Sequence, residues 1–150
     1  MAHWVPCEKD TIVFNDFRDG NFCAVAMNWK TKEERVIPGF PVSALSEDGK
    51  WALSINYARL YVTRPDYGYA GDGQDARVNA VFPEDDGLWR VDLKTGEAKL
   101  IVSCAAVKRM VPQVATNGMS YICHTVISKD MQRVYFLSRS VDQSMAGVKR

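Results

Sequence analysis

The chain has 150 residues, of which 47% are hydrophobic and 25% are charged. This composition is typical of a globular domain and argues against disorder. Nineteen basic and eighteen acidic residues give a formal net charge of +1, so no overall field attracts nucleic acid or an anionic membrane. No apolar run approaches the roughly 20 residues that span a bilayer, and the N-terminus lacks a secretory signal pattern. We therefore predict a cytoplasmic protein that binds neither nucleic acid nor membrane.

Short segments rich in β-branched and aromatic residues recur along the chain, with turn-forming residues between them. They are a partial strand at 2–5 and further strands at 11–15, 22–28, 35–38, 41–45, 51–55, 87–93, 98–103, 121–127 and 133–139. This spacing predicts an antiparallel all-β protein. Residues 104–110 predict one short helix, because Ala, Val and Met recur at helical intervals and Pro112 follows.

The segments repeat. "MNWKTKEERVI" (27–37) aligns with "VDLKTGEAKLI" (91–101), and "SEDGKWALS" (46–54) aligns with "SKDMQRVYF" (128–136). Each unit predicts a four-stranded antiparallel sheet, which is the blade of a β-propeller.

Two turn types within the repeat depend on glycine in one copy. Gly49 and Gly96 supply the positive φ that a tight hairpin requires. Lys32 and Met131 occupy the matching positions in the other copies. We expect those two turns to be strained, longer or differently shaped.

The units predict a single domain of about two and a half blades. Blade 1 covers about 2–40, and blade 2 covers about 41–103 with an insertion at 56–86. A linker at 104–120 leads to a partial blade 3 at 121–150. Propellers typically close with four to eight blades, so we expect an incomplete ring. Its open faces predict self-association or packing against missing blades.

These repeats carry a resemblance to a known group. "LSEDGKWALS", "GLWRVDLKTGEAKLIVS" and "HTVISKDMQRVYFLSR" resemble repeats of bacterial propellers of the Tol-type and oligogalacturonate-lyase-like group, with WD40-like repeats. The resemblance implies a propeller fold. Lyases of this group hold a divalent metal such as manganese with several histidines and cleave uronate chains by β-elimination. His124 alone matches such a ligand, and with two histidines in the chain a multi-histidine site cannot be built from this chain alone.

The insertion contains the candidate binding residues. Residues 56–77 hold four tyrosines and three arginines, which offer stacking surfaces for sugar rings and bidentate contacts for anions. The candidates for ligand binding are Tyr57, Tyr67, Tyr69 and Arg77. The candidates for contacting a uronate carboxylate during catalysis are Arg59 and Arg64.

Structural roles compete with each of these assignments. "YARLYVT" (57–63) can extend a strand, the tyrosines can pack on a neighbouring blade, and the arginines can pair with Asp66, Asp72 or Asp75. His124 can be a buried, hydrogen-bonded histidine rather than a metal ligand or general base. "PEDDG" (83–87) lacks the spacing of a calcium loop and predicts a solvated turn.

The four cysteines, Cys7, Cys23, Cys104 and Cys123, are widely spaced without a C-x-x-C pair, which predicts buried thiols rather than disulfides or a zinc site. The leading functional hypothesis is a propeller segment that binds a ligand or partner, with an acidic oligosaccharide as the ligand. The alternatives are a metal-dependent oligogalacturonate-type lyase and an interaction scaffold without a small ligand.

Overall fold

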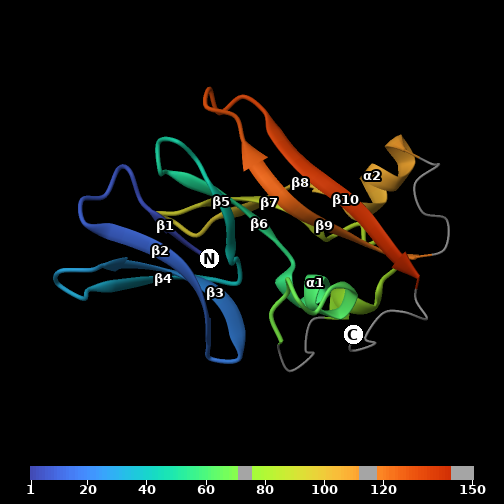
Figure 1. Cartoon of the computed structure of the whole chain (residues 1–150), viewed down its shortest axis with the longest axis horizontal. Coiled ribbons are helices and arrows are strands. Elements are labelled where there is room, and N and C mark those ends of the chain that lie inside the picture. Colours follow the sequence, from blue (N-terminus) through green and yellow to red (C-terminus); the bar gives the residue numbers. More distant parts are fainter. Residues whose placement is uncertain (71–75, 112–117, 143–150) are drawn as a thin grey trace.

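The computed structural model describes residues 1–70, 76–111 and 118–142, and antiparallel sheets are its main regular structure (Figure 1). One sheet contains four strands in chain order: β1 (Ala2–Trp4), β2 (Thr11–Arg18), β3 (Asn21–Asn28) and β4 (Glu34–Pro38). A second sheet likewise contains β5 (Val42–Leu45), β6 (Trp51–Ile55), β7 (Gly87–Asp92) and β8 (Ala98–Ser103). The third pairs β9 (Gly118–Ile127) with β10 (Val134–Asp142). The predicted antiparallel all-β class is confirmed.

The second sheet packs against both of the others, so the core has two parts. One apolar cluster joins the first and second sheets, with Val13, Ile37 and Val91 at its centre. The other joins the second sheet to β9 and the insertion, with Leu53 and Leu88 fully buried. Consecutive sheets therefore bury their apolar faces against each other along the chain.

Polar contacts fix the positions of the sheets. The Asn15 side chain of β2 accepts from the Val42 amide at 2.6 Å and donates to the Val42 carbonyl at 2.8 Å. Between the second and third sheets, the hydroxyls of Ser43 on β5 and Thr125 on β9 lie 2.5 Å apart and are buried. Because buried polar groups require partners, these two contacts specify how the three sheets align at β5.

The sequence repeat is also a repeat of hydrogen bonds. The side chain of Asn28 accepts from the amides of Lys30 and Thr31 at 3.0 and 3.2 Å. Asp92 accepts in the same way at 2.9 and 2.8 Å. The hydroxyls of Ser46 and Ser128 each donate to an aspartate two residues ahead, at 2.7 and 2.5 Å.

The expected strain in the turns without glycine is confirmed. Lys32 has φ 66° and Met131 has φ 57°, close to the 75° of Gly96 and the 68° of Gly49. A non-glycine side chain in this left-handed region is unfavourable. The turn geometry is therefore imposed by the paired strands on either side rather than by the local residue.

The insertion contains helices, so the alternative in which residues 57–63 extend a strand is wrong. Residues Tyr57–Thr63 form α1, and Ala76–Asn79 form the short helix η1. Asn56 begins α1 as its N-cap, with its side-chain oxygen accepting from the Arg59 amide at 2.8 Å. An N-cap asparagine followed by residues that tolerate a helix outweighs the β-branched and aromatic character of the segment.

The two ends of the insertion are tied together at Asp86. The side-chain amide of Asn56 donates to Asp86 at 2.8 Å, and the Gly87 amide donates to the other carboxylate oxygen at 2.8 Å. Asp86 is 1% exposed. The prediction of a solvated turn at 83–87 is thus wrong for Pro83, Asp86 and Gly87, which are buried, and holds for Glu84 and Asp85, which are exposed.

The predicted helix at 104–110 is confirmed as α2 (Cys104–Met110), capped by the Ser103 hydroxyl, which accepts from the Ala106 amide at 3.0 Å. All four cysteines are free; Cys7 is exposed and the other three are buried. Within the described ranges, neither α1 nor α2 has the length and apolar character needed to cross a membrane.

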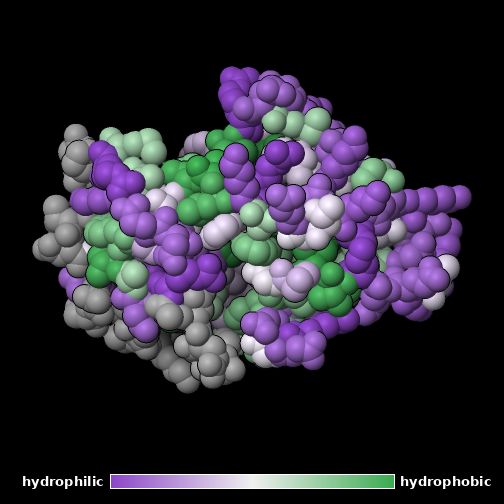
Figure 2. All heavy atoms as spheres, turned by 180° about the vertical axis from the view of Figure 1, so that it is seen from behind, coloured by the Kyte–Doolittle hydropathy of each residue, from purple (hydrophilic) through white to green (hydrophobic). Residues whose placement is uncertain are grey.

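The face opposite to that of Figure 1 is mixed in character. Apolar atoms reach the surface there in separate groups among hydrophilic side chains (Figure 2).

On the first sheet, the strand register places Trp4, Ile12 and Val36 on the face turned away from the second sheet. Trp4 is 64% exposed and Val36 is 44% exposed, whereas Val25 in the middle of the same face is buried, so this apolar face is exposed at the edge strands β1 and β4.

Asp86 provides a test of how the insertion is held. Replacing it with alanine leaves the Asn56 and Gly87 donors without their carboxylate, and we expect Asp86→Ala to lower the free energy of unfolding by about 3 kcal/mol. Urea unfolding followed by circular dichroism measures this loss. Asp85→Ala is the matched control and should change stability by less than about 0.5 kcal/mol; equal effects of the two variants would contradict the assignment.

Candidate functional site

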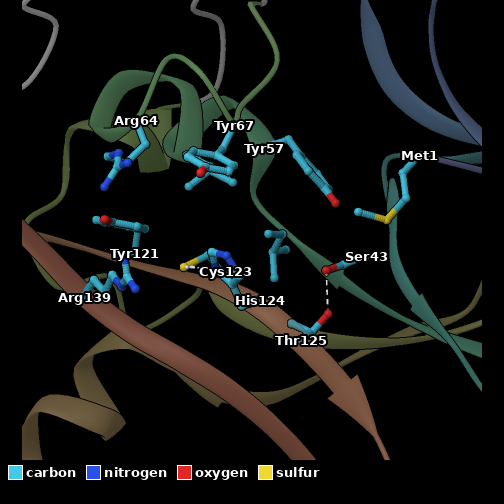
Figure 3. A pocket seen from close by; sticks show the side chains of 12 residues that line it. Met1, Ser43, Tyr57, Arg64, Tyr67, Tyr121, Cys123, His124, Thr125 and Arg139 are labelled. Carbon is cyan, nitrogen blue, oxygen red and sulfur yellow. Dashed lines mark hydrogen bonds between the residues drawn. The ribbon is translucent and has the colours of Figure 1, made fainter. Parts of the chain in front are cut away.

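A pocket of about 310 Å³ lies between the insertion and the third sheet. Figure 3 shows its lining. The insertion and the loop after α1 supply one wall, β9 and β10 supply the opposite wall, and β5 and β6 contribute between them. The lining residues are Met1, Ser43, Ile55, Tyr57, Leu60, Arg64, Tyr67, Tyr121, Cys123, His124, Thr125 and Arg139.

The helical conformation of the insertion decides which of its residues reach the pocket. Tyr57, Leu60 and Arg64 follow helical spacing and share one face of α1 and its C-cap. Arg59 and Thr63 fall on another side and are buried. A strand would instead have placed Tyr57 and Arg59 on the same face, so the helix separates these two candidate residues.

Tyr57 forms a buried part of the wall. It is 5% exposed, and its hydroxyl donates to the Val42 carbonyl at 3.3 Å. Burial raises the pKa of Tyr57 to about 12, and the neighbouring Tyr69 acts in the same direction. Tyr57 is therefore a neutral hydrogen-bonding group at physiological pH.

Tyr67 and His124 face each other across the pocket. Their ring centroids are 6.0 Å apart, and Tyr67 is 56% exposed. His124 is exposed as well, which excludes the buried role that was one reading of it. Its φ of 52° accompanies an irregularity in the pairing of β9 with β10 between Tyr135 and Leu137. Such a bulge re-aims side chains, and here both His124 and Cys123 line the pocket.

His124 contacts the residue before it. Its Nδ1 lies 3.1 Å from the Sγ of Cys123. Cys123 is 5% exposed. Burial raises the pKa of the Cys123 thiol, while the positive charges of Arg139 and Arg64 act in the opposite direction. The pocket therefore contains a thiol beside an imidazole and within range of two guanidinium groups.

Arg64 and Arg139 give the pocket its charge. Both line it, and Figure 3 draws them toward one end, with Met1 and Ser43 toward the other. The guanidinium of Arg64 lies 5.3 Å from the Tyr67 ring centroid. Across the described residues, no carboxylate forms an ion pair with either arginine, and none of the 12 lining residues is acidic. The predicted pairing of Arg64 with Asp66 is absent, and Asp72 and Asp75 lie outside the described residues.

Arg59 does not reach the pocket. It is 1% exposed, and its guanidinium donates to carbonyls of three other segments. The acceptors are Ser120 on β9, Arg77 and Val78 in η1, and Val81 beyond it. The expectation that Arg59 contacts a ligand carboxylate is therefore replaced by a structural role, because its donors are committed to the backbone.

Tyr69 and Arg77 do not line the pocket. The Tyr69 ring stacks on Tyr57 with centroids 4.3 Å apart and planes at 10°. Its hydroxyl accepts from the Asn15 side chain at 3.0 Å. Arg77 belongs to η1, and its carbonyl accepts from Arg59 at 2.9 Å. Neither lines the pocket, so the structure brings together Tyr57, Arg64, Tyr67 and His124 out of the predicted set.

Sequence reasoning missed the contribution of the third sheet. Tyr121 and Arg139 are directly paired across β9 and β10 and both line the pocket. The available signal was Arg139 near the end of a predicted apolar strand, at a position where a charged side chain must reach solvent or a partner. Cys123 was assigned to the core, and the structure places it in the core and on the pocket wall.

The donor set does not fit a metal. Among residues 1–70, 76–111 and 118–142, no group of three or more His, Cys, Asp or Glu side chains could hold a metal ion. His124 has no second ligand beside it other than Cys123 in that part of the chain. We derive no step through a divalent metal such as manganese.

Comparison with known proteins returns no similarity: no family model, curated protein or solved structure matches the chain. The site is therefore interpreted from its own geometry.

Arg59 can be tested as a structural arginine. Lysine keeps the charge but cannot direct donors at several carbonyls in different directions. We expect Arg59→Lys to lower the free energy of unfolding by about 3 kcal/mol, because buried carbonyls lose their partners. Urea unfolding measures the loss. Arg133→Lys, at an 82% exposed side chain, is the control, and an unchanged stability of Arg59→Lys would contradict the role.

Tyr57 gives a pH test of its burial. The tyrosine of the unfolded chain ionises near pH 10, and that of the folded chain ionises at about 12. Between pH 10 and about 12 the folded chain keeps the Tyr57 proton that the unfolded chain has lost. The contribution of Tyr57 to the free energy of unfolding is therefore fully present below pH 10 and is lost as the pH rises toward 12.

The size of this effect is about 2 to 3 kcal/mol. It is measured as the difference between the native chain and Tyr57→Phe in urea unfolding across pH 9 to about 12. The phenylalanine variant lacks the ionising group, so its stability should fall less over this range. Parallel pH profiles for the two proteins would show that Tyr57 ionises normally in the folded chain.

Proposed function

We propose that the chain is a propeller-type binding segment whose pocket holds a small acidic carbohydrate through Arg64 and Arg139. The observation that carries the proposal is the pair of guanidinium groups that line one pocket without a carboxylate partner in the described chain. A pocket with uncompensated positive charge favours an anion, and arginine binds carboxylate or phosphate in a bidentate manner.

The fold supports the propeller part of the proposal. Two four-stranded antiparallel sheets follow one another in chain order, and each packs against the next. The third sheet repeats the serine–aspartate turn that joins β5 to β6. Its two strands thus match the first two strands of a further unit. We propose that the exposed apolar side chains Trp4 and Val36 on the edge strands of the first sheet pack against another copy or against further blades.

The aromatic lining supports a ring-shaped ligand. Tyr57, Tyr67 and Tyr121 line the pocket together with the hydroxyls of Ser43 and Thr125. Aromatic faces pack on the apolar face of a sugar ring, and hydroxyls orient its polar edge. The volume of about 310 Å³ is at the small end of ligand pockets, which favours one or two sugar rings over a long chain.

A β-elimination activity is the second candidate. It is favoured by one observation, the exposed imidazole of His124 in the same pocket as two arginines. A base and a charge stabiliser beside a carboxylate are what such a reaction requires. Binding is the leading proposal because it requires only the arginines and tyrosines.

The binding experiment uses isothermal titration calorimetry with galacturonate and digalacturonate, and with galactose as the neutral control. We expect the acidic sugars to bind and galactose not to bind, and we expect added salt to weaken the binding. Arg139→Gln and Arg64→Gln should each weaken it by roughly tenfold or more, because each removes a charge-assisted hydrogen bond. Absorbance of the unsaturated product, followed in parallel, detects elimination.

The control variant is Arg133→Gln. Arg133 lies in the turn of the same hairpin, pairs with Asp130 at 3.5 Å and does not line the pocket. Its replacement removes one positive charge from the hairpin without touching the site, so affinity should be unchanged. Equal binding of galactose and galacturonate, or equal losses in all three variants, would overturn the proposed anion site.

A further inference from the structure

The pocket contains a nucleophile beside a base. The Sγ of Cys123 lies 3.1 Å from Nδ1 of His124, and both residues line the pocket. A thiol within hydrogen-bonding distance of an imidazole is the arrangement in which histidine activates cysteine. The positive φ of His124, 52°, lets two consecutive residues of one strand contribute to the same cavity.

The surroundings distinguish Cys123 from the other cysteines. Cys7 is exposed, while Cys23 and Cys104 are buried and lie outside the pocket. Only Cys123 combines pocket access with a neighbouring imidazole and two guanidinium groups among the described residues. An electropositive environment with access for a reagent is typical of reactive cysteines, and Cys123, although 5% exposed, has that access because it lines the pocket.

We propose that Cys123 is a nucleophilic thiol, with His124 as its proton acceptor, that reacts with small carboxylic acids carrying an electrophilic carbon. The proposal rests on the anion site of the proposed function, because Arg64 and Arg139 are the groups that would hold the acid's carboxylate.

The reaction conserves atoms and charge. The thiol proton moves to Nδ1 of His124, which must be the unprotonated nitrogen of the neutral ring. The sulfur electron pair forms a bond to the electrophilic carbon of the bound acid. The bond from that carbon to its leaving group breaks, and the leaving group departs with that electron pair. The products are a thioether on Cys123, the free leaving group and a proton on His124, which passes to solvent.

Burial makes the base necessary. Because burial raises the pKa of the Cys123 thiol despite the two nearby arginines, the sulfur is a protonated donor at neutral pH. Without a proton acceptor in contact, such a thiol reacts slowly. The imidazole at 3.1 Å supplies the acceptor, and the charged end of the pocket selects anionic reagents.

The test compares alkylation by iodoacetate, an anion, with alkylation by iodoacetamide, its neutral analogue. The native chain is treated with each reagent, the reaction is quenched over time, and each cysteine is followed by peptide mass spectrometry. Cys7 is the internal reference, since it is exposed and lies outside the pocket. We expect the iodoacetate to iodoacetamide rate ratio to be roughly tenfold higher at Cys123 than at Cys7, because the local positive charge raises the concentration of anions.

Two variants separate the roles. Asparagine tolerates positive φ, so His124→Asn removes the imidazole with little backbone strain. It should slow alkylation of Cys123 by roughly a hundredfold, the usual contribution of a positioned base, without changing Cys7. Arg139→Gln should lower the iodoacetate to iodoacetamide ratio at Cys123 toward that of Cys7, and Arg133→Gln should leave it unchanged.

The outcomes distinguish the thiol from the anion site. If Cys123 reacts no faster than Cys23 and Cys104 while galacturonate still binds, the thiol proposal is overturned and the proposed function stands. If Cys123 reacts rapidly with both reagents at the same ratio as Cys7, and galacturonate does not bind, the selection of anions is overturned together with the proposed function. A high ratio that disappears in Arg139→Gln supports both.

Discussion

The guanidinium of Arg59 is the contact on which the candidate site depends. It sits in the interior at 1% exposure and donates to carbonyls on β9, in η1 and in the segment that returns to β7. These segments are far apart in the sequence. Ser120 also donates to the Val81 carbonyl from its amide and its hydroxyl, and α1 and β9 share one apolar cluster. A buried arginine is costly unless its donors are satisfied, and the donors of Arg59 find their acceptors when α1, η1 and β9 are all in place. Arg59 therefore helps to hold together the two elements between which the pocket lies.

The repeated sheets could be predicted from sequence because their signals are local. Turn residues such as Asp92 and Gly96 act on their own neighbours, and alternating apolar strands between them need no knowledge of the rest of the chain. Even the strain at Lys32 and Met131 was predictable, since it follows from comparing copies of one turn. The physics that defines these elements lies within a few residues of each of them.

The insertion could not be predicted in the same way. Its residues have strand-like propensities. Three contacts determine its conformation: the N-cap of α1 by Asn56, the hydrogen bond from Asn56 to Asp86, 30 residues away, and the hydrogen bonds of Arg59. The cap is local, whereas the tie to Asp86 and the contacts of Arg59 are tertiary contacts that override local preference. Five of the 12 lining residues come from β9 and β10, so the composition of the pocket depends on which sheet packs against α1. Residue type identified Arg64, Tyr67 and His124, but only the packing added Tyr121, Cys123 and Arg139.

The charges elsewhere in the molecule show why Arg64 and Arg139 stand apart. Four other arginines each contact a carboxylate: Arg18, Arg35, Arg109 and Arg133. The chain as a whole is nearly neutral at +1, so acidic groups are available in number. Exposed ion pairs contribute little to stability, so the lack of a carboxylate partner for Arg64 and Arg139 among the described residues costs the fold little. It does change the pocket, because two positive charges near a buried thiol and three tyrosines create a local field that the balanced surface lacks.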